Sequence, residues 1–241
     1  MWAALKRLDI PAFTVYHHLA APGQATTWDY YDPEMLPLIE IYSVWQSSET
    51  PEGIIAKDRK KLPGCTARDA LTRGLKVGFI GGGDTHELRP GERGIAGVYA
   101  ADCTKEAIWE ALKAKRCYAA TGVRIELEFS IAGVGMGGEI VFTPYTQDTL
   151  FPATCEIRVK GTAPIRSIEI IDNGEIIYRR SPCFGLREIE MKTIIQNLVR
   201  LQGGASLSTP SHACYLRVTQ EDGNMAWSSP IFLTRDFSGI E

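Results

Sequence analysis

An aspartate and a histidine, Asp84 and His86, stand two positions apart directly after three consecutive glycines. In extended backbone, residues i and i+2 project to the same side, so both side chains could point at one common atom for which the glycines leave room. A carboxylate oxygen and an imidazole nitrogen are good ligands for a divalent transition metal. The pattern is short, and it is also compatible with a turn capped by Asp84 and a histidine on a loop. We treat both residues as candidate catalytic and metal-binding groups.

Two adjacent histidines follow another apolar segment. The run from Ala12 to Tyr16 is typical of a buried strand, and it delivers His17 and His18 to its C-terminal end. In α/β folds, functional groups lie at the C-terminal ends of the strands. Because neighbouring residues of a strand point in opposite directions, we expect at least one of the two histidines to face the site.

A single carboxylate interrupts a third apolar segment, Leu38 to Ser43, at Glu40. An ionised carboxylate that is buried alone is costly, so an inward-facing Glu40 needs a partner or a metal. An outward-facing Glu40 on a strand with one exposed side needs neither, and the sequence leaves both possibilities open.

The elements around these segments alternate over residues 1–120. Helices are expected over residues 2–8, 66–73 and 105–116; the second begins with a box-like cap formed by Thr66 and Asp69. Residues 46–61 and 88–97 are expected to be loops. Strands and helices in this order predict a mostly parallel α/β sheet or barrel.

From about residue 123, polar and apolar residues alternate with the period of a half-buried strand. About seven short strands follow without a convincing helix, and Asn173-Gly174 is a strong hairpin signal between two of them. This pattern predicts an antiparallel β-sandwich. We therefore expect two domains, residues 1–122 and 123–241.

Composition narrows the classes of function. The chain has 241 residues, 44% apolar and 23% charged, with a net charge of −3, which favours neither nucleic acid nor an anionic membrane as partner. It has no apolar run of about 18 residues that could span a bilayer. Six scattered cysteines without a C-x-x-C pair indicate free thiols in a reducing compartment such as the cytoplasm, although composition does not fix the location.

The glycine-rich segment around Gly81 and Gly83 could also be interpreted as a dinucleotide-binding motif. That motif requires a strand, then G-x-G-x-x-G and then a helix. Gly81 and Gly83 match the first two glycines, but His86 occupies the third position and Pro90 prevents a helix from following. Without a helix N-terminus nothing would hold the pyrophosphate, so we reject this interpretation.

Four segments of the sequence together resemble the C-terminal half of a PHP domain (polymerase and histidinol phosphatase), with its β-rich tail. They are residues 37–49, 78–86, 117–122 and 226–231. The resemblance spans nearly the whole chain and is greatest to the branch that includes carbaryl hydrolase-like metallohydrolases. It implies a distorted seven-stranded β/α barrel with two or three divalent metals, zinc, manganese or iron, at the C-terminal ends of its strands.

The resemblance also implies roles for individual residues. Asp84 and His86 take the place of the family's terminal D-x-H, and the mid-barrel histidine maps best onto His18, with His17 as the alternative. Glu40 matches a strand position that orients a ligand. The implied reaction is hydrolysis of a phosphoester or a carbamate-like ester by metal-activated water.

This sequence departs from the family in one large respect. The H-x-H strand with which the family begins, and the ligands that follow it, are absent, since Met1 lies only ten residues before the His17-His18 strand. We therefore expect a partial barrel with weak metal binding and little turnover, and self-association or a second chain that supplies the missing half. The alternative is a non-catalytic binding module, in which the sandwich holds a partner or glycan.

Overall fold

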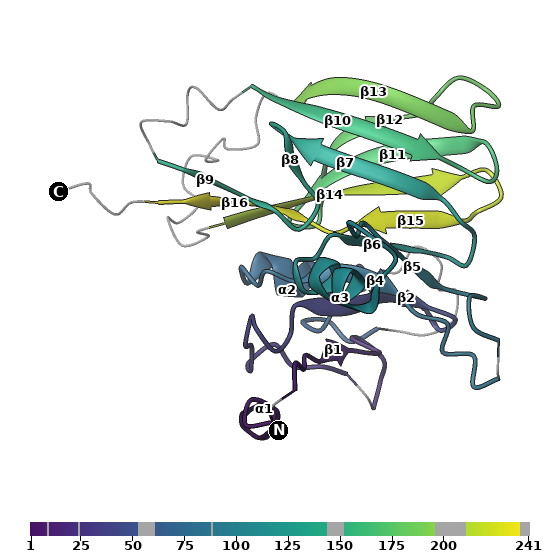
Figure 1. Ribbon diagram of the computed structural model, residues 1–241. Coiled ribbons are helices and arrows are strands. Elements are labelled where there is room, and N and C mark those ends of the chain that lie inside the picture. The colour runs from purple at the N-terminus through teal and green to yellow at the C-terminus, as the bar shows by residue number, and fades with distance from the viewer. Residues whose placement is uncertain are drawn as a thin grey trace.

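The computed structural model describes residues 1–8, 10–23, 25–52, 61–87, 89–143, 152–195 and 211–236, the side chains of Ser211 and Arg235 excepted. The chain forms a β-sandwich stacked on a smaller unit of strands and short helices (Figure 1). Within the described ranges, no helix is both long and apolar enough to cross a membrane.

A four-stranded open sheet lies in the smaller unit. Its central strand β2 (Leu38–Ser43) runs parallel to β1 (Val15–Tyr16) on one side and to β4 (Gly78–Gly81) on the other, while β3 (Gln46–Ser47) pairs antiparallel with the end of β2. The three parallel strands were expected from their apolar runs, and their C-terminal ends meet at one edge of the sheet.

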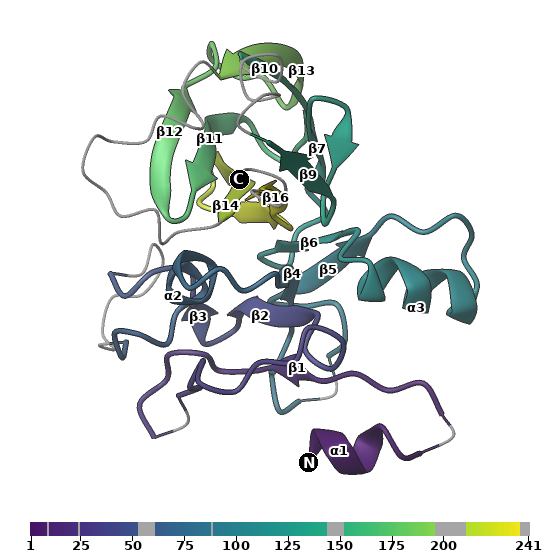
Figure 2. The same cartoon turned by 90° about the vertical axis from the view of Figure 1, so that its left-hand side faces the viewer.

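Three helices accompany this sheet: α1 (Trp2–Leu5), α2 (Ala67–Thr72) and α3 (Lys105–Lys113). The predicted cap of α2 is confirmed, because Thr66 Oγ1 accepts a hydrogen bond from the Asp69 backbone while Asp69 Oδ2 accepts one from the Thr66 backbone at 2.8 Å. Helices α1 and α3 end three residues earlier than expected, and the left-handed backbone at Lys115, φ +61°, follows the end of α3. Figure 2 shows α2 and α3 on opposite sides of the strands.

Twelve strands make up the rest of the structure and confirm its β-rich character. One sheet has the order β13-β10-β7-β8, and the other has the order β12-β11-β14-β15-β6-β5, with β16 beside β14 and β9 beside β16. The strands are β5 (Ile95–Val98), β6 (Cys117–Ala120), β7 (Glu126–Ile131), β8 (Val134–Gly135), β9 (Glu139–Phe142), β10 (Ala153–Lys160), β11 (Ile165–Asp172), β12 (Glu175–Arg180), β13 (Glu188–Ile195), β14 (Ser211–Gln220), β15 (Met225–Ser228) and β16 (Ile231–Arg235).

The two sheets enclose an apolar core, as the alternating pattern predicts. Along β10 every second side chain is buried, and Ile157 and Val159 pack with Leu127, Leu216 and other inward-facing residues. The hairpin between β11 and β12 turns at Asn173 and Gly174 with φ angles of +47° and +89°, which confirms the predicted turn.

Two segments differ from the sequence-based expectation. The loop expected over residues 88–97 contains the start of β5, and Gln46 and Ser47 form β3 instead of opening an exposed loop; of that second loop, residues 53–60 lie outside the described part. Both strands were missed because they are short; β3 pairs with the adjacent end of β2, whereas β5 pairs with β6, which follows α3 in the sequence.

Strands β5 and β6 precede residue 122 but belong to the larger sandwich sheet, since β6 pairs with β15. The expected boundary thus falls between two consecutive strands, β6 and β7, and the division of the chain into two domains there stays a prediction. A second core cluster also joins the units: Phe79 of β4 packs edge-on against Tyr215 of β14, with ring centroids 5.2 Å apart.

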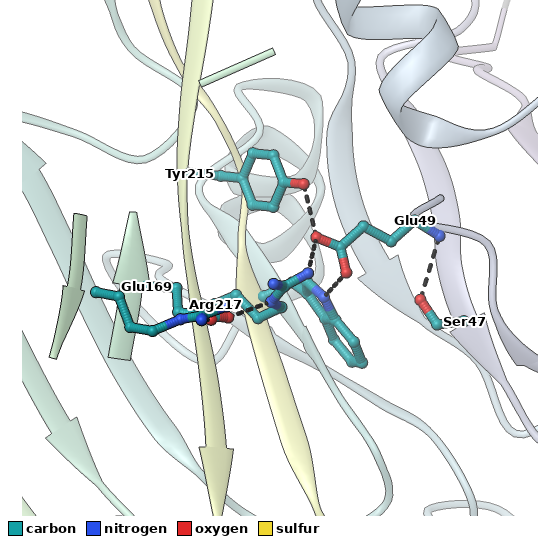
Figure 3. Close-up of polar contacts among 7 residues, drawn as sticks. Ser47, Glu49, Glu169, Tyr215 and Arg217 are labelled. Carbon is teal, nitrogen blue, oxygen red and sulfur yellow. Dashed lines mark hydrogen bonds and ion pairs between the residues drawn. The ribbon is translucent and has the colours of Figure 1, made fainter. Parts of the chain in front are cut away.

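A buried polar network locks the segment after β3 to the sandwich (Figure 3). The fully buried carboxylate of Glu49 accepts hydrogen bonds from Tyr215 Oη at 2.7 Å, Arg217 Nη1 at 2.8 Å and Trp227 Nε1 at 2.8 Å. Arg217 Nε in turn donates to Glu169 Oε2 at 2.7 Å. Because both charges of the Glu49–Arg217 pair are satisfied, the network holds the two units in one relative position.

Candidate metal centre

All five residues singled out in the sequence meet at the C-terminal edge of the small sheet. His17 and His18 follow β1, Glu40 lies within β2, and Asp84 and His86 follow β4. The parallel order of β1, β2 and β4 brings these segments together, although up to 69 residues separate them in the sequence.

Asp84 lies at the centre of the cluster. Its Oδ2 atom lies 3.1 Å from Nε2 of His18 and 3.3 Å from Nε2 of His17, and its Oδ1 atom lies 3.0 Å from Nε2 of His86. Oδ2 is buried, yet it accepts no hydrogen bond of good geometry from any residue in the described ranges. A buried carboxylate oxygen without a donor is costly unless a cation neutralises it.

Glu40 finds its partner in His17. The side chain of Glu40 is only 11% exposed, and its Oε1 atom lies 2.9 Å from Nδ1 of His17. Burial raises the pKa of Glu40, whereas the neighbouring His17 opposes this rise. When Nδ1 donates to Glu40, Nε2 of the same ring is the unprotonated nitrogen and faces Asp84, an arrangement that orients a metal-binding histidine.

The two adjacent histidines do not point in opposite directions, as strand geometry had led us to expect. His18 has left-handed backbone, with φ +54°, which turns its ring back to lie beside the ring of His17 at a centroid distance of 3.6 Å. Burial, and then the neighbouring His17, lower the pKa of His18, which favours the neutral ring, the form that binds metals. Both histidines therefore face the site.

The D-x-H segment also departs from extended geometry. Asp84 and His86 have φ angles of +42° and +53°, a conformation that non-glycine residues seldom adopt. Their side chains nevertheless meet, at 3.0 Å, as the spacing had suggested. His86 lies at the rim, where 77% of its side chain is exposed, so it is the most accessible of the five residues. Strained backbone of this kind often accompanies functional sites.

Gly82 lies directly beside the cluster. A Cβ atom at Gly82 would overlap the Oε2 atom of Glu40. The glycine thus makes room for the carboxylate that orients His17.

The donor set fits a divalent transition metal. Ligand atoms of His17, His18 and Glu40 all lie within 4.8 Å of one another, and Asp84 adds a fourth donor beside both rings. Two ligands on one zinc ion, with bonds of about 2.1 Å, are at most about 4.2 Å apart. Ligands in tetrahedral geometry on such an ion are about 3.4 Å apart, which is close to the distances of 3.3 Å and 3.1 Å from Asp84 Oδ2 to Nε2 of His17 and His18. Mixed imidazole and carboxylate donors suit zinc, manganese or iron.

A pocket of about 240 Å³ opens beside the cluster. Among the residues that line it are His18, Glu40 and His86, together with Trp45, Gln46 and Lys61. Sequence reasoning missed Gln46 and Lys61, because a glutamine and a lysine in a polar segment carry no signal of burial.

Four aromatic residues on loops of the smaller unit have different environments. Trp45 lines the pocket, with its ring centroid 6.4 Å from that of His86. Trp28 is buried in the core, Tyr31 donates a hydrogen bond to the Lys76 carbonyl, and Tyr30 is exposed.

Comparison with known proteins finds similar proteins, but their descriptions give no activity. Residues 83–141, which include Asp84 and His86, match the family model described as "Protein of unknown function (DUF3604)". Uncharacterized proteins of Chlamydia pneumoniae, Chlamydia trachomatis serovar D and Chlamydia muridarum are similar, with 31%, 32% and 30% identity over 94% of this chain. This chain spans 38% of the length of each of these relatives. No solved structure matches it.

Proposed function

We propose that this chain carries part of the active site of a metal-dependent hydrolase of the PHP type, which acts on a phosphoester or a carbamate-like ester. The observation that carries the proposal is the buried Oδ2 atom of Asp84, which lies against two imidazole nitrogens without a hydrogen bond. Since Nδ1 of His17 is engaged by Glu40, the lone pairs of His17 Nε2 and Asp84 Oδ2 face each other. This arrangement repels unless a cation or a proton lies between them.

In this proposal, each residue of the cluster has its own role. His17, His18 and Asp84 would hold a metal, and Glu40 would fix the ring of His17 in the required orientation. A divalent metal at such a position supplies a Lewis acid that activates water and neutralises developing charge. His86, exposed at the rim with Nε2 against Asp84 Oδ1, is placed to hold or move a proton at that nitrogen.

The proposal extends to the barrel. In this proposal, the three parallel strands whose C-terminal ends carry the candidate ligands would form the second half of a β/α barrel of the PHP type. We propose that additional strands and ligands come from another segment or a partner chain, and that this chain by itself binds metal weakly and turns over little substrate. The greater length of the chlamydial relatives is compatible with this view.

Metal content tests the proposal. The purified chain would be dialysed to equilibrium against zinc, manganese or iron, and the metal bound in excess of the buffer would be measured by elemental mass spectrometry, beside Asp84→Ala and His18→Ala. His212→Ala is the matched control, because His212 pairs with Asp172 in the sandwich at 2.6 Å, away from the cluster. We expect metal in the wild-type chain and the control and its loss in both cluster variants. A wild-type chain that retains no metal would overturn the proposal for this chain.

One observation favours the alternative, a binding module. The sandwich has its own cavity of about 310 Å³, where apolar side chains such as Phe129 and Met191 meet charged ones such as Arg158 and Glu190. A mixed lining of this kind suits a ligand with both apolar and polar parts. Retention of a glycan from an array by the metal-free chain, and its loss in Met191→Glu, would support this reading. Equal retention by Met191→Glu would count against it.

A further inference from the structure

Lys61 places a buried positive charge at the pocket beside the metal cluster. Its side chain lines the same pocket as His18, Glu40 and His86. Its Nζ atom is buried and has no hydrogen-bond partner among the residues that the structure describes. An ammonium group has three donors and a strong need for solvation, so a buried one without a partner is unusual in a stable fold.

A second polar group in the pocket is also unsatisfied. The Oε1 atom of Gln46 is buried and accepts no hydrogen bond from the described part of the chain. Gln46 has a φ angle of +104°, far from the usual range of a non-glycine residue, at the first position of β3. Strained backbone thus holds this amide at the pocket, and strain of this kind persists where the surrounding fold maintains it.

The neighbouring carboxylate of Glu49 does not neutralise the charge of Lys61. Glu49 attracts Lys61 electrostatically, but three donors from the sandwich already bind the Glu49 carboxylate, among them Arg217. Burial lowers the pKa of Lys61 to about 8, and the attraction of Glu49 offsets this only in part. At neutral pH the ammonium form still dominates, so the pocket offers a charge that an anion could neutralise.

We propose that Lys61 binds an oxyanion of the substrate, a phosphate or a carboxylate, while Gln46 Oε1 accepts a hydrogen bond from a hydroxyl or N–H group of the same molecule. This inference rests on the proposed hydrolase function and narrows its substrates to small anionic esters that also carry a hydrogen-bond donor. The pocket volume of about 240 Å³ restricts the ligand to a small molecule. Trp45 supplies an apolar wall at the same opening.

Calorimetric titration with inorganic phosphate and, separately, with acetate tests this inference. The manganese-equilibrated wild-type chain would be compared with Lys61→Met and with the matched control Lys113→Met, whose lysine is exposed in the last turn of α3. We expect at least about tenfold weaker binding of one anion in Lys61→Met, no change in Lys113→Met and equal metal content in all three chains. The anion that responds identifies the source of the oxyanion. Equal affinity in wild type and Lys61→Met, or no binding of either anion to wild type, would overturn the inference.

The same measurement in the presence of a chelator separates the two proposals. Lys61-dependent anion binding that persists with the chelator, in a wild-type chain that binds no metal without the chelator, would refute the hydrolase proposal and leave the anion site standing. Metal binding together with an anion affinity that does not depend on Lys61 would overturn the anion site and leave the hydrolase proposal standing.

A chemical measurement on the wild-type chain makes the test independent of variant folding. Phosphate or acetate should slow reductive methylation of Lys61 relative to that of Lys113, as followed by peptide mass spectrometry. Equal rates with and without either anion would contradict the inference.

Discussion

Nδ1 of His17 lies 2.9 Å from Oε1 of Glu40, and this contact decides which nitrogen of the ring faces Asp84. With the proton on Nδ1, Nε2 offers its lone pair to the cluster, as metal-binding histidines do when a carboxylate holds the opposite nitrogen. Glu40 is thus positioned to act through His17 even where it does not itself touch a metal.

The substitution Glu40→Gln should weaken metal binding by about tenfold, because an amide holds the His17 ring without the negative charge that raises its basicity. The measurement is a competition titration against a zinc chelator. The control is Glu126→Gln on β7, whose side chain is 66% exposed. Equal affinity of Glu40→Gln and wild type would show that Glu40 neither orients nor binds.

The substitution Gly82→Ala should also lower metal affinity, since its Cβ atom would overlap the Glu40 carboxylate and displace it from His17. Gly135→Ala is the matched control, because nothing lies within 4 Å of a Cβ built there. Metal affinity by the same competition titration and the urea midpoint would be measured for both. A Gly82→Ala chain with unchanged metal affinity would mean that Glu40 has another position available.

The buried charge of Lys61 should make stability depend on pH. Burial lowers its pKa from 10.5 to about 8 in the folded chain, so the unfolded chain binds more protons between those two values. The free energy of unfolding should therefore rise with pH from about 8 to about 10.5 through this group. Lys61→Met should be more stable than wild type at pH 7, and its advantage should shrink at pH 10.

Urea unfolding of both chains at the two pH values measures this difference, and the comparison cancels the titration of other groups. An advantage of Lys61→Met that is equal at pH 7 and pH 10 would show that Lys61 keeps an ordinary pKa in the folded state.

Glu49→Ala should destabilise the fold by about 3–5 kcal/mol, because it leaves the buried Arg217 with one of its two carboxylates and removes the acceptor of Tyr215 and Trp227. Urea unfolding would be compared with Glu52→Ala, whose side chain is 71% exposed and which should change stability by less than about 0.5 kcal/mol. Equal stabilities of the two variants would show that the network contributes little beyond orientation.

The sequence predicted elements whose signal is local. The run Leu38–Ser43 is a strand with the expected bounds, the cap of Thr66 and Asp69 formed as expected, and Asn173-Gly174 turns a hairpin. Each of these rests on side-chain alternation or on turn and cap chemistry that neighbouring residues decide.

Other features depend on contacts distant in sequence and left no local signal. Strand β5 exists because β6 pairs with it, and Glu49 is buried because the sandwich provides its donors. In the candidate site, the five residues were found from their types and from the strands that carry them. The left-handed backbone at His18, Asp84 and His86 was missed, because none of these residues is a glycine, the residue type that usually indicates this conformation.

The pairing of β6 with β15 bears on how this protein can vary between lineages. A recombination event that exchanged only residues 123–241 would bring a foreign strand to β6 and foreign groups to the Glu49 carboxylate. A hybrid whose new segment lacks a counterpart of Arg217 would carry a buried, uncompensated charge at Glu49. The two segments are therefore expected to be inherited together, and a change at Arg217 should be accompanied by a change at Glu49.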